Sequence, residues 1–117
     1  MTSLEMTKEI AKILDNKKAI DIKAIKVRDI SSLADYFVIA AGSSSTQVKA
    51  LADEVEYKLK QIQVSPEHIE GHRSNSWILI DYGNVIVHVF SKEAREFYDL
   101  ERLWQDGENL DLSEILN

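Results

Sequence analysis

The chain has 117 residues and a formal net charge of −6 at pH 7. With 44% hydrophobic and 29% charged residues, one proline and four glycines, its composition is that of a folded globular protein and excludes a disordered one. The lack of cysteine excludes a disulfide scaffold and thiolate metal ligation. No apolar run approaches the ~20 residues of a membrane span, and Glu5 and Glu9 stand where a secretion signal would be basic and then apolar. We therefore expect a cytoplasmic protein without a membrane segment.

The acidic excess lies at the C-terminal end of the chain. Residues 93–117 hold eight acidic side chains against Arg95 and Arg102, a net charge of −6, whereas residues 1–92 carry twelve charges of each sign. Phosphate-backbone binding relies on lysine and arginine, so this distribution suits a basic protein partner better than direct, sequence-specific nucleic-acid binding. A solubilising tail would have the same composition, and charge alone does not separate the two.

Hydrophobic periodicity predicts the elements of the first half. A helix with one apolar side and a threonine or serine cap is predicted over residues 2–16. Residues 19–27 alternate between apolar and polar, as in a strand with one wet face, and residues 36–41 are almost continuously apolar, as in a strand buried on both faces. A second amphipathic helix is predicted over residues 46–62 and ends before Pro66, which cannot continue it.

The second half is built around a predicted β-hairpin. Residues 77–90 form two β-rich runs joined by a tight turn at Tyr82-Gly83-Asn84, since glycine and asparagine tolerate positive φ. A short strand over residues 67–71 and a polar loop over 72–75 precede the hairpin. A helix capped by Ser91 is predicted over residues 91–100.

Periodicity is lost beyond Trp104. We therefore expect one domain over residues 1–104 and an acidic C-terminal extension over 105–117, which forms a last turn or stays loose. The predicted fold class is α/β, a single mixed sheet covered by helices.

The segment from Gly42 to Thr46 joins a predicted strand to a predicted helix. Backbone N–H groups at a helix N-terminus can hold an anion, but the segment lacks the signatures of a P-loop and of a dinucleotide site. A nucleotidyl transferase would add two carboxylates one residue apart on a neighbouring strand, and the hairpin offers only Asp81. A metal-dependent nucleotide enzyme therefore stays an alternative, although the metal-binding half of its site is missing. The roles of helix cap and turn already account for the segment.

Three histidines raise the question of a metal site. His68 and His72 are four residues apart, but the proline and glycine around them argue against the helix that would bring them onto one face. Without cysteine and without such a helix, we expect no metal and no other cofactor. His88 lies among apolar residues of a predicted strand, where a hydrogen-bonded structural histidine is commoner than a general base.

Aromatic and apolar side chains gather near charges after the hairpin. Phe97, Leu100 and Trp104 recur at the spacing of a core-facing helical stripe, and packing is the expected role of Phe97 and Leu100. Tyr98 and Leu103 fall off that stripe. Tryptophan and tyrosine beside acidic residues are typical of a protein-binding patch. A homodimer through this face or through a sheet edge is left open by the sequence.

A string of motifs in fixed order resembles the Iojap-related ribosomal silencing factor family, RsfS. The motifs span residues 6–104, and together they are far more specific than any one of them. They are ADYFVIAAGSSSTQVKALADEV at residues 34–55, Glu70-Gly71, WILIDYG at 77–83, VHVF at 87–90 and REFYDLERLW at 95–104.

The resemblance implies a fold like that of nucleotidyl transferases without the catalytic carboxylates, and no enzymatic activity. It implies binding to the fourteenth protein of the large ribosomal subunit, on the face that meets the small subunit. A factor bound there would sterically block subunit joining and repress translation when nutrients are short. An assembly factor for large-subunit precursors could use the same surface.

The resemblance also implies the residues of the partner surface. Those that match the family motif, and that we expect to bind the partner, are Trp77, Leu79 and Asp81 on the hairpin and Tyr98, Leu100, Glu101 and Trp104 after it. His88 and Arg95 match as well, with a binding or a structural role. Asn84 stands where many relatives have aspartate, which removes a charge from the turn.

Overall fold

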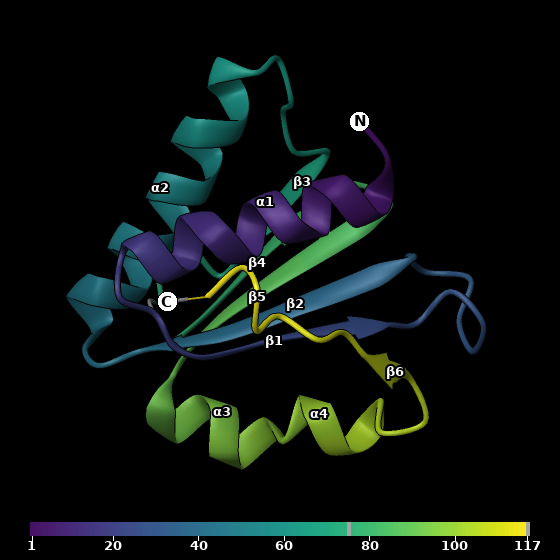
Figure 1. The fold of residues 1–117 in the computed structure, drawn as a ribbon. Helices are drawn as coiled ribbons and strands as arrows, with labels where there is room; N and C mark the ends of the chain where they lie inside the picture. The colour runs from purple at the N-terminus through teal and green to yellow at the C-terminus, as the bar shows by residue number, and fades with distance from the viewer. Residues whose placement is uncertain (75, 117) are drawn as a thin grey trace.

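Six strands form one mixed sheet in the order β3-β4-β5-β2-β1-β6, and helices lie on both of its faces (Figure 1). The computed structural model describes residues 1–74 and 76–116, so Asn75 at the end of the predicted polar loop lies outside the described residues. The elements are α1 (Ser3–Asn16), β1 (Ile20–Lys26), β2 (Tyr36–Gly42), α2 (Ser45–Gln61), β3 (His68–Glu70), β4 (Trp77–Asp81), β5 (Val85–Ser91), α3 (Lys92–Tyr98), α4 (Leu100–Leu103) and β6 (Glu108–Asn109). The predicted fold class is confirmed.

The centre of the sheet is the parallel pair β2 and β5. Every residue of β2 is buried, as the continuous apolar run predicted, because helices cover this strand on both sides. The pairing runs from Tyr36 opposite Val85 to Gly42 opposite Ser91, and the other strand pairs are antiparallel. The strands that flank this pair, β4 beside β5 and β1 beside β2, both run antiparallel to it.

Helices α1 and α2 cover one face of the sheet and form the larger core (Figure 1). Helix α1 begins with a capping box, in which Thr2 Oγ1 accepts from the Glu5 N–H at 3.1 Å and Glu5 Oε1 accepts from the Thr2 N–H at 2.9 Å. The apolar stripes of both helices pack on alternate residues of the strands, including Ile78 and Ile80 of β4. Since alternate residues face opposite sides, Trp77, Leu79 and Asp81 face away from these helices.

Helices α3 and α4 cover part of the other face and close a smaller core around Phe37, Phe90 and Leu100. The sequence predicted one helix over residues 91–100, and the structure divides this region at Asp99. Asp99 has φ 47° and ψ 51°, a left-handed conformation that ends α3 and lets α4 start in a new direction. The break changes which side chains of this segment face the sheet.

The C-terminal segment is packed against the sheet and core. Strand β6 pairs with β1, with Ile25 opposite Asn109 and Lys26 opposite Glu108, although periodicity predicted no strand there. Further on, Leu112 is buried in the larger core. A two-residue strand carries too short a pattern to be recognised from sequence. The division of the chain into a domain and an extension at residue 104 stays a prediction.

Replacing Leu112 by alanine should lower the free energy of unfolding by about 2–4 kcal/mol, because it empties a site in the larger core. Chemical denaturation at neutral pH measures the change. The matched control is Leu103→Ala, since Leu103 is 73% exposed and the same truncation there should cost less than about 0.5 kcal/mol. Equal stabilities of the two variants would mean that the C-terminal segment does not pack as described.

Candidate functional site

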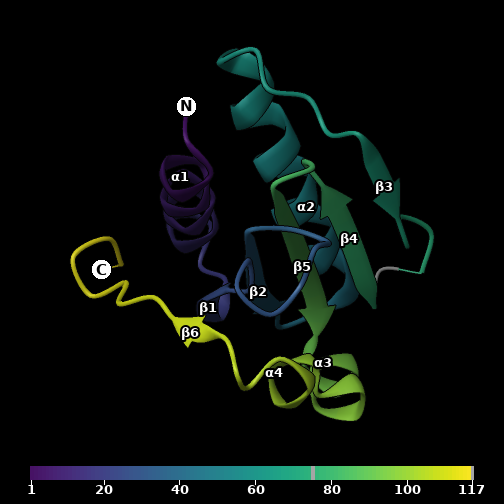
Figure 2. The same ribbon diagram turned by 90° about the vertical axis from the view of Figure 1, so that its right-hand side faces the viewer.

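The candidate site is the part of the second sheet face that α3 and α4 leave uncovered. Helix α3 contacts β5 and β2, and Figure 2 shows both short helices gathered at the end of β5, away from β3. Three half-buried side chains of β4, Trp77, Leu79 and Asp81, therefore line a sheet face that the described helices cover only beside Trp77, where Tyr98 of α3 packs. We call this surface, together with Tyr98 at the end of α3, the open face.

Trp77 is the centre of an aromatic cluster on the open face. Its ring centroid lies 4.9 Å from that of Phe90, the residue opposite it on β5, and 4.7 Å from that of Tyr98. Tyr98 is 51% exposed, whereas Phe90 is fully buried. The cluster thus runs from the core to the surface and holds two large amphipathic rings in place at low entropic cost.

His88 lies beneath Trp77 and is 4% exposed. Its Nδ1 accepts a hydrogen bond of 3.2 Å from Trp77 Nε1, so a neutral His88 carries its proton on Nε2, which is buried and has no partner among the described residues. Burial lowers the pKa of His88 to about 4, so the ring is neutral at physiological pH. The geometry gives His88 the role of fixing the Trp77 indole.

Asp81 and Leu79 occupy the rest of the open face on β4. Asp81 Oδ1 accepts from the Gly83 N–H at 2.7 Å, and the Tyr82 N–H donates to the Val85 carbonyl at 2.9 Å across the same turn. Gly83 has φ +87°, which only glycine adopts without strain, so the predicted hairpin turn is confirmed. One carboxylate oxygen of Asp81 is therefore engaged in the turn. Leu79 lies opposite His88 and extends the apolar part of the face.

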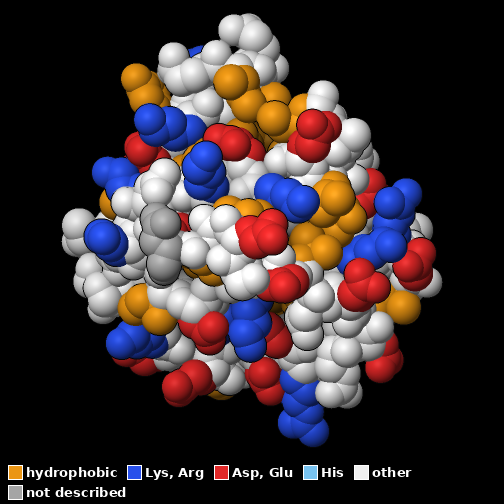
Figure 3. Space-filling view, viewed as in Figure 1, with side chains coloured by type: hydrophobic (Ala, Val, Ile, Leu, Met, Phe, Trp, Pro, Cys, Tyr) orange, Lys and Arg blue, Asp and Glu red, His pale blue; other side chains and the backbone are white. Residues whose placement is uncertain are grey.

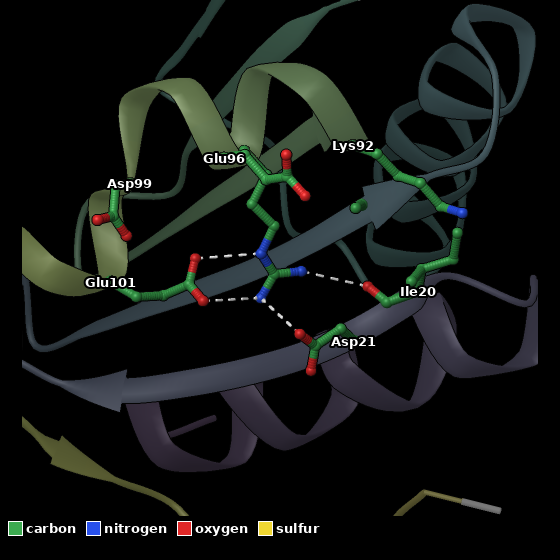
Figure 4. A pocket seen from close by; sticks show the side chains of 8 residues that line it. Ile20, Asp21, Lys92, Glu96, Asp99 and Glu101 are labelled. Atoms are coloured by element: carbon green, nitrogen blue, oxygen red, sulfur yellow. Dashed lines mark hydrogen bonds and ion pairs between the residues drawn. The ribbon is translucent and has the colours of Figure 1, made fainter.

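Arg95 and Glu101 form an ion pair between α3 and α4 (Figure 4). Arg95 Nε and Nη2 donate to the two carboxylate oxygens of Glu101 at 3.1 and 3.3 Å, and Nη1 donates to the Ile20 carbonyl at 3.3 Å. The Arg95 side chain is only 10% exposed, and its Nη2 also lies 3.8 Å from Asp21. This bidentate pair fastens the two short helices to β1. The structure thus gives Arg95 and Glu101 a positioning role.

The remaining predicted residues lie deeper than the open face. Leu100 is 9% exposed and belongs to the smaller core. Trp104 is half-buried, with its ring centroid 5.1 Å from that of Phe37 in an edge-on contact. The expected packing of Leu100 is confirmed. The ring of Trp104 contacts Phe37 and is not among the rings paired with Trp77.

The expected packing of Phe97 is wrong, because Phe97 is 80% exposed. The stripe of Phe97, Leu100 and Trp104 assumed one continuous helix, and the left-handed Asp99 turns Phe97 away from the core. Phe97 instead packs edge-on against Tyr98, with ring centroids 5.0 Å apart. Leu103 is also exposed, at 73%. Both residues add apolar surface next to Tyr98, and only the exposure of Phe97 was missed by periodicity, since Leu103 already fell off the predicted core-facing stripe.

The nucleotide alternative fails on geometry. Strand β5 lies between β2 and β4, and register places Asp81 opposite Ile86, level with Phe37 at the start of β2. Gly42 lies five residues beyond Phe37 along β2, so along the strand direction it is roughly 16 Å from the level of Asp81. In the loop itself, Ser44 Oγ accepts from the Gln47 N–H at 3.1 Å and Ser43 Oγ donates to Gln47 Oε1 at 2.7 Å. These contacts are those of the predicted cap and turn.

Two general surface features bear on partner class. Figure 3, viewed over α1 and the C-terminal segment, shows acidic and basic side chains interspersed on this face, so no single-sign patch suited to a phosphate backbone appears on it. Among the described residues, the helices are too short or too polar to cross a bilayer.

Comparison with known proteins gives consistent matches over the whole chain. A family model described as "Ribosomal silencing factor during starvation" matches residues 1–117. The ribosomal silencing factor RsfS of Bacillus subtilis is 38% identical over 100% of this chain and 99% of its own. A solved crystal structure from Chromobacterium violaceum has a TM-score of 0.87 at 38% identity and covers 95% of this chain and 92% of its own.

A more distant relative carries a different description. The mouse protein named "Mitochondrial assembly of ribosomal large subunit protein 1" is 31% identical over 98 residues, which are 81% of this chain and 43% of the mouse protein. The matching region is thus less than half of that longer protein.

The buried His88 should make stability pH-dependent. Its pKa of about 4 in the folded state lies below the ordinary value of about 6.5, so the unfolded chain binds more protons between these values. Above pH 6.5, His88 makes its full contribution to the free energy of unfolding. This contribution falls as the pH drops toward 4, and at pH 4.5 it is smaller by about 2–3 kcal/mol. Urea unfolding at pH 7 and 4.5 should show a smaller loss for His88→Gln than for the unmodified chain. The same loss in both would contradict a neutral, buried His88.

Proposed function

Because the chain belongs to the family of ribosomal silencing factors, we propose that it binds the large ribosomal subunit and keeps the small subunit from joining it. The family match covers residues 1–117, and the Bacillus subtilis relative matches over nearly its full length. The proposal implies a regulator that represses translation when nutrients are short and that works in the cytoplasm, where its target is.

The observation that carries the proposal is the open face. It exposes a Trp77–Tyr98 pair whose rings are 4.7 Å apart and rest on buried Phe90. Tryptophan and tyrosine dominate the energetics of protein interfaces, most of all when they are rigid before binding. The hydrogen bond from Trp77 to His88 provides that rigidity. Leu79 and exposed Phe97 extend the apolar surface around this pair.

We infer that the partner is the fourteenth protein of the large subunit, bound at the open face. The acidic charge of the chain is concentrated after residue 92, and Glu93, Glu96 and Asp99 are exposed on the α3 segment that carries Tyr98. A basic ribosomal protein would be attracted to this end and oriented by it. In this proposal Trp77, Leu79 and Tyr98 make contact, while His88, Arg95 and Glu101 hold them in place.

Steric exclusion requires no chemistry, and the polar groups near the open face are suited to none. Asp81 accepts a hydrogen bond within the turn, and Gly42 lies at the other end of the sheet. A protein of this size bound where the two subunits meet would obstruct joining by its volume alone. We therefore propose a binding module and not an enzyme.

A second candidate is an assembly factor for the large subunit. The name of the mouse relative favours it, although that protein is longer than this chain. Both functions use the open face, and they differ in the particle that is bound. An assembly factor would bind large-subunit precursors and leave mature subunits alone, whereas a silencing factor binds mature large subunits.

Co-sedimentation with isolated large subunits, small subunits, precursor particles and preformed ribosomes separates these possibilities. We expect binding to mature large subunits and a loss of joining when small subunits are added afterwards. Binding to precursor particles alone would show that the chain is an assembly factor and not a silencing factor. Binding to none of the particles would refute both functions for this chain.

Trp77→Ala and Tyr98→Ala should each weaken binding to large subunits by about 2 kcal/mol or more, roughly 30-fold in Kd, because each removes a buried anchor of the interface. The matched control is Tyr57→Ala. Tyr57 is 59% exposed, but it lies on α2, which covers the opposite sheet face, so its loss should leave affinity unchanged. Circular dichroism establishes that each variant is folded. A folded Tyr98→Ala variant with full affinity would remove Tyr98 from the site.

A further inference from the structure

Three side chains with metal-binding atoms meet on the side of the sheet opposite the open face. They are Asp53 and Glu56 of α2 and His72 of the loop after β3, and one ligand atom of each lies within 4.8 Å of the others. Sequence spacing suggests only His68 with His72 as a pair of ligands and predicts no metal site. In the structure these histidines separate, with His68 Nε2 3.3 Å from Glu70 and His72 Nε2 3.4 Å from Asp53.

Local backbone geometry explains why His72 reaches α2. Asp53 and Glu56 are three residues apart and therefore lie on the same side of the helix. Gly71 has φ +80°, and a Cβ at this position would collide with the Trp77 carbonyl. Only glycine lets the chain turn this close to β4, and the turn sends the next residue, His72, toward α2. The three groups thus come from two segments that the fold fixes independently.

The site carries negative charge without a balancing basic residue. Among the ion pairs of the described residues, Asp53 has only the His72 imidazole, which is charged only when protonated, and Glu56 has none. Two neighbouring carboxylates repel each other and favour a bound cation. The imidazole nitrogen beside them distinguishes this cluster from an ordinary acidic surface.

A buried hydroxyl in the core beneath α2, without a partner within residues 1–74 and 76–116, is a second indication. Tyr82 is 8% exposed and belongs to the core beneath α2, yet its hydroxyl is buried with no hydrogen-bond partner among the described residues. Burial and, second, the negative charge of Glu56 raise the pKa of this phenol, so the hydroxyl stays protonated at neutral pH. Buried hydroxyls are usually hydrogen-bonded. A water molecule on a cation held by Glu56 could donate a hydrogen bond to the oxygen of this hydroxyl.

We propose that Asp53, Glu56 and His72 bind one divalent transition-metal ion, with Zn²⁺ as the best fit. One imidazole and two carboxylates are a donor set that zinc accepts, and three protein ligands leave a position for water. The imidazole disfavours Mg²⁺ and Ca²⁺, which take oxygen ligands. The ion would tie α2 to the loop that leads into β4, and so would brace the strand that begins with Trp77.

The proposal is tested with untagged full-length protein that has been freed of metal by a chelator and dialysed. Titration with ZnCl₂ by isothermal calorimetry should give saturable binding of one ion per chain, and excess Zn²⁺ should raise the unfolding temperature. His72→Ala should weaken Zn²⁺ binding by about tenfold or more and remove the thermal shift. MgCl₂ at the same concentration should give neither effect.

The matched control is His68→Ala, since His68 also lies beside a carboxylate, Glu70, but outside this cluster. It should retain both Zn²⁺ binding and the thermal shift. The proposal is overturned if the unmodified protein binds no Zn²⁺ saturably, if His72→Ala binds it as tightly, or if Mg²⁺ binds equally well. Asp53→Asn provides a second variant that keeps side-chain volume and should also weaken binding. None of these results depends on the ribosome.

Discussion

The parallel pairing of β2 and β5 determines the rest of the fold. It brings two strands that are more than forty residues apart in sequence into register from Tyr36–Val85 to Gly42–Ser91. The interior position of β2 requires the all-apolar sequence that it has, and β5 is buried at five of its seven residues. Because β5 ends level with β2, α3 begins at the edge where it can turn back under the sheet. The hairpin then places β4 outside β5, where one face is covered and the other is not.

The candidate site follows from how far the second helical layer extends. Helices α1 and α2 lie over one face, and α3 with α4 is held toward β1 by Arg95, which bonds Glu101 of α4 and the Ile20 carbonyl of β1. Both the left-handed Asp99 and this ion pair direct the chain away from β3 and β4. The side chains of β4 on that face are therefore left uncovered. The ion pair of Arg95 and Glu101 thus helps to determine which side chains near Trp77 are exposed.

Sequence patterns predicted what depends on neighbours along the chain. The two long helices, the buried β2 run and the hairpin turn follow from local periodicity and turn chemistry, whereas Trp77, Leu79 and Asp81 were singled out only by the family motif. Features that depend on distant contacts were not predictable in this way. Strand β6 exists because β1 offers it an edge, and His72 lies near Asp53 because Gly71 turns there.

The break at Asp99 shows most clearly where sequence reasoning ends. A non-glycine residue in the left-handed region is uncommon, and nothing in the local pattern indicates it. With a continuous helix, Phe97 and Leu100 would share one stripe, whereas in the structure Phe97 is exposed and Leu100 buried. The family motif drew attention to this segment as a partner surface, and that role stays a prediction. Tertiary contacts are needed to separate its exposed residues from those that hold them in place.

The polar groups around the open face are committed to structure, and this favours binding over catalysis. A general base must be able to take a proton near neutral pH, and burial lowers the pKa of His88 to about 4 while its Nδ1 holds Trp77. Asp81 supports the turn, and Arg95 and Glu101 neutralise each other between the short helices. Beside the second carboxylate oxygen of Asp81, what remains accessible on the open face is mainly the apolar and aromatic surface of Trp77, Leu79 and Tyr98. Such a surface, held rigid by buried hydrogen bonds, lowers the entropic cost of association and needs no reacting group.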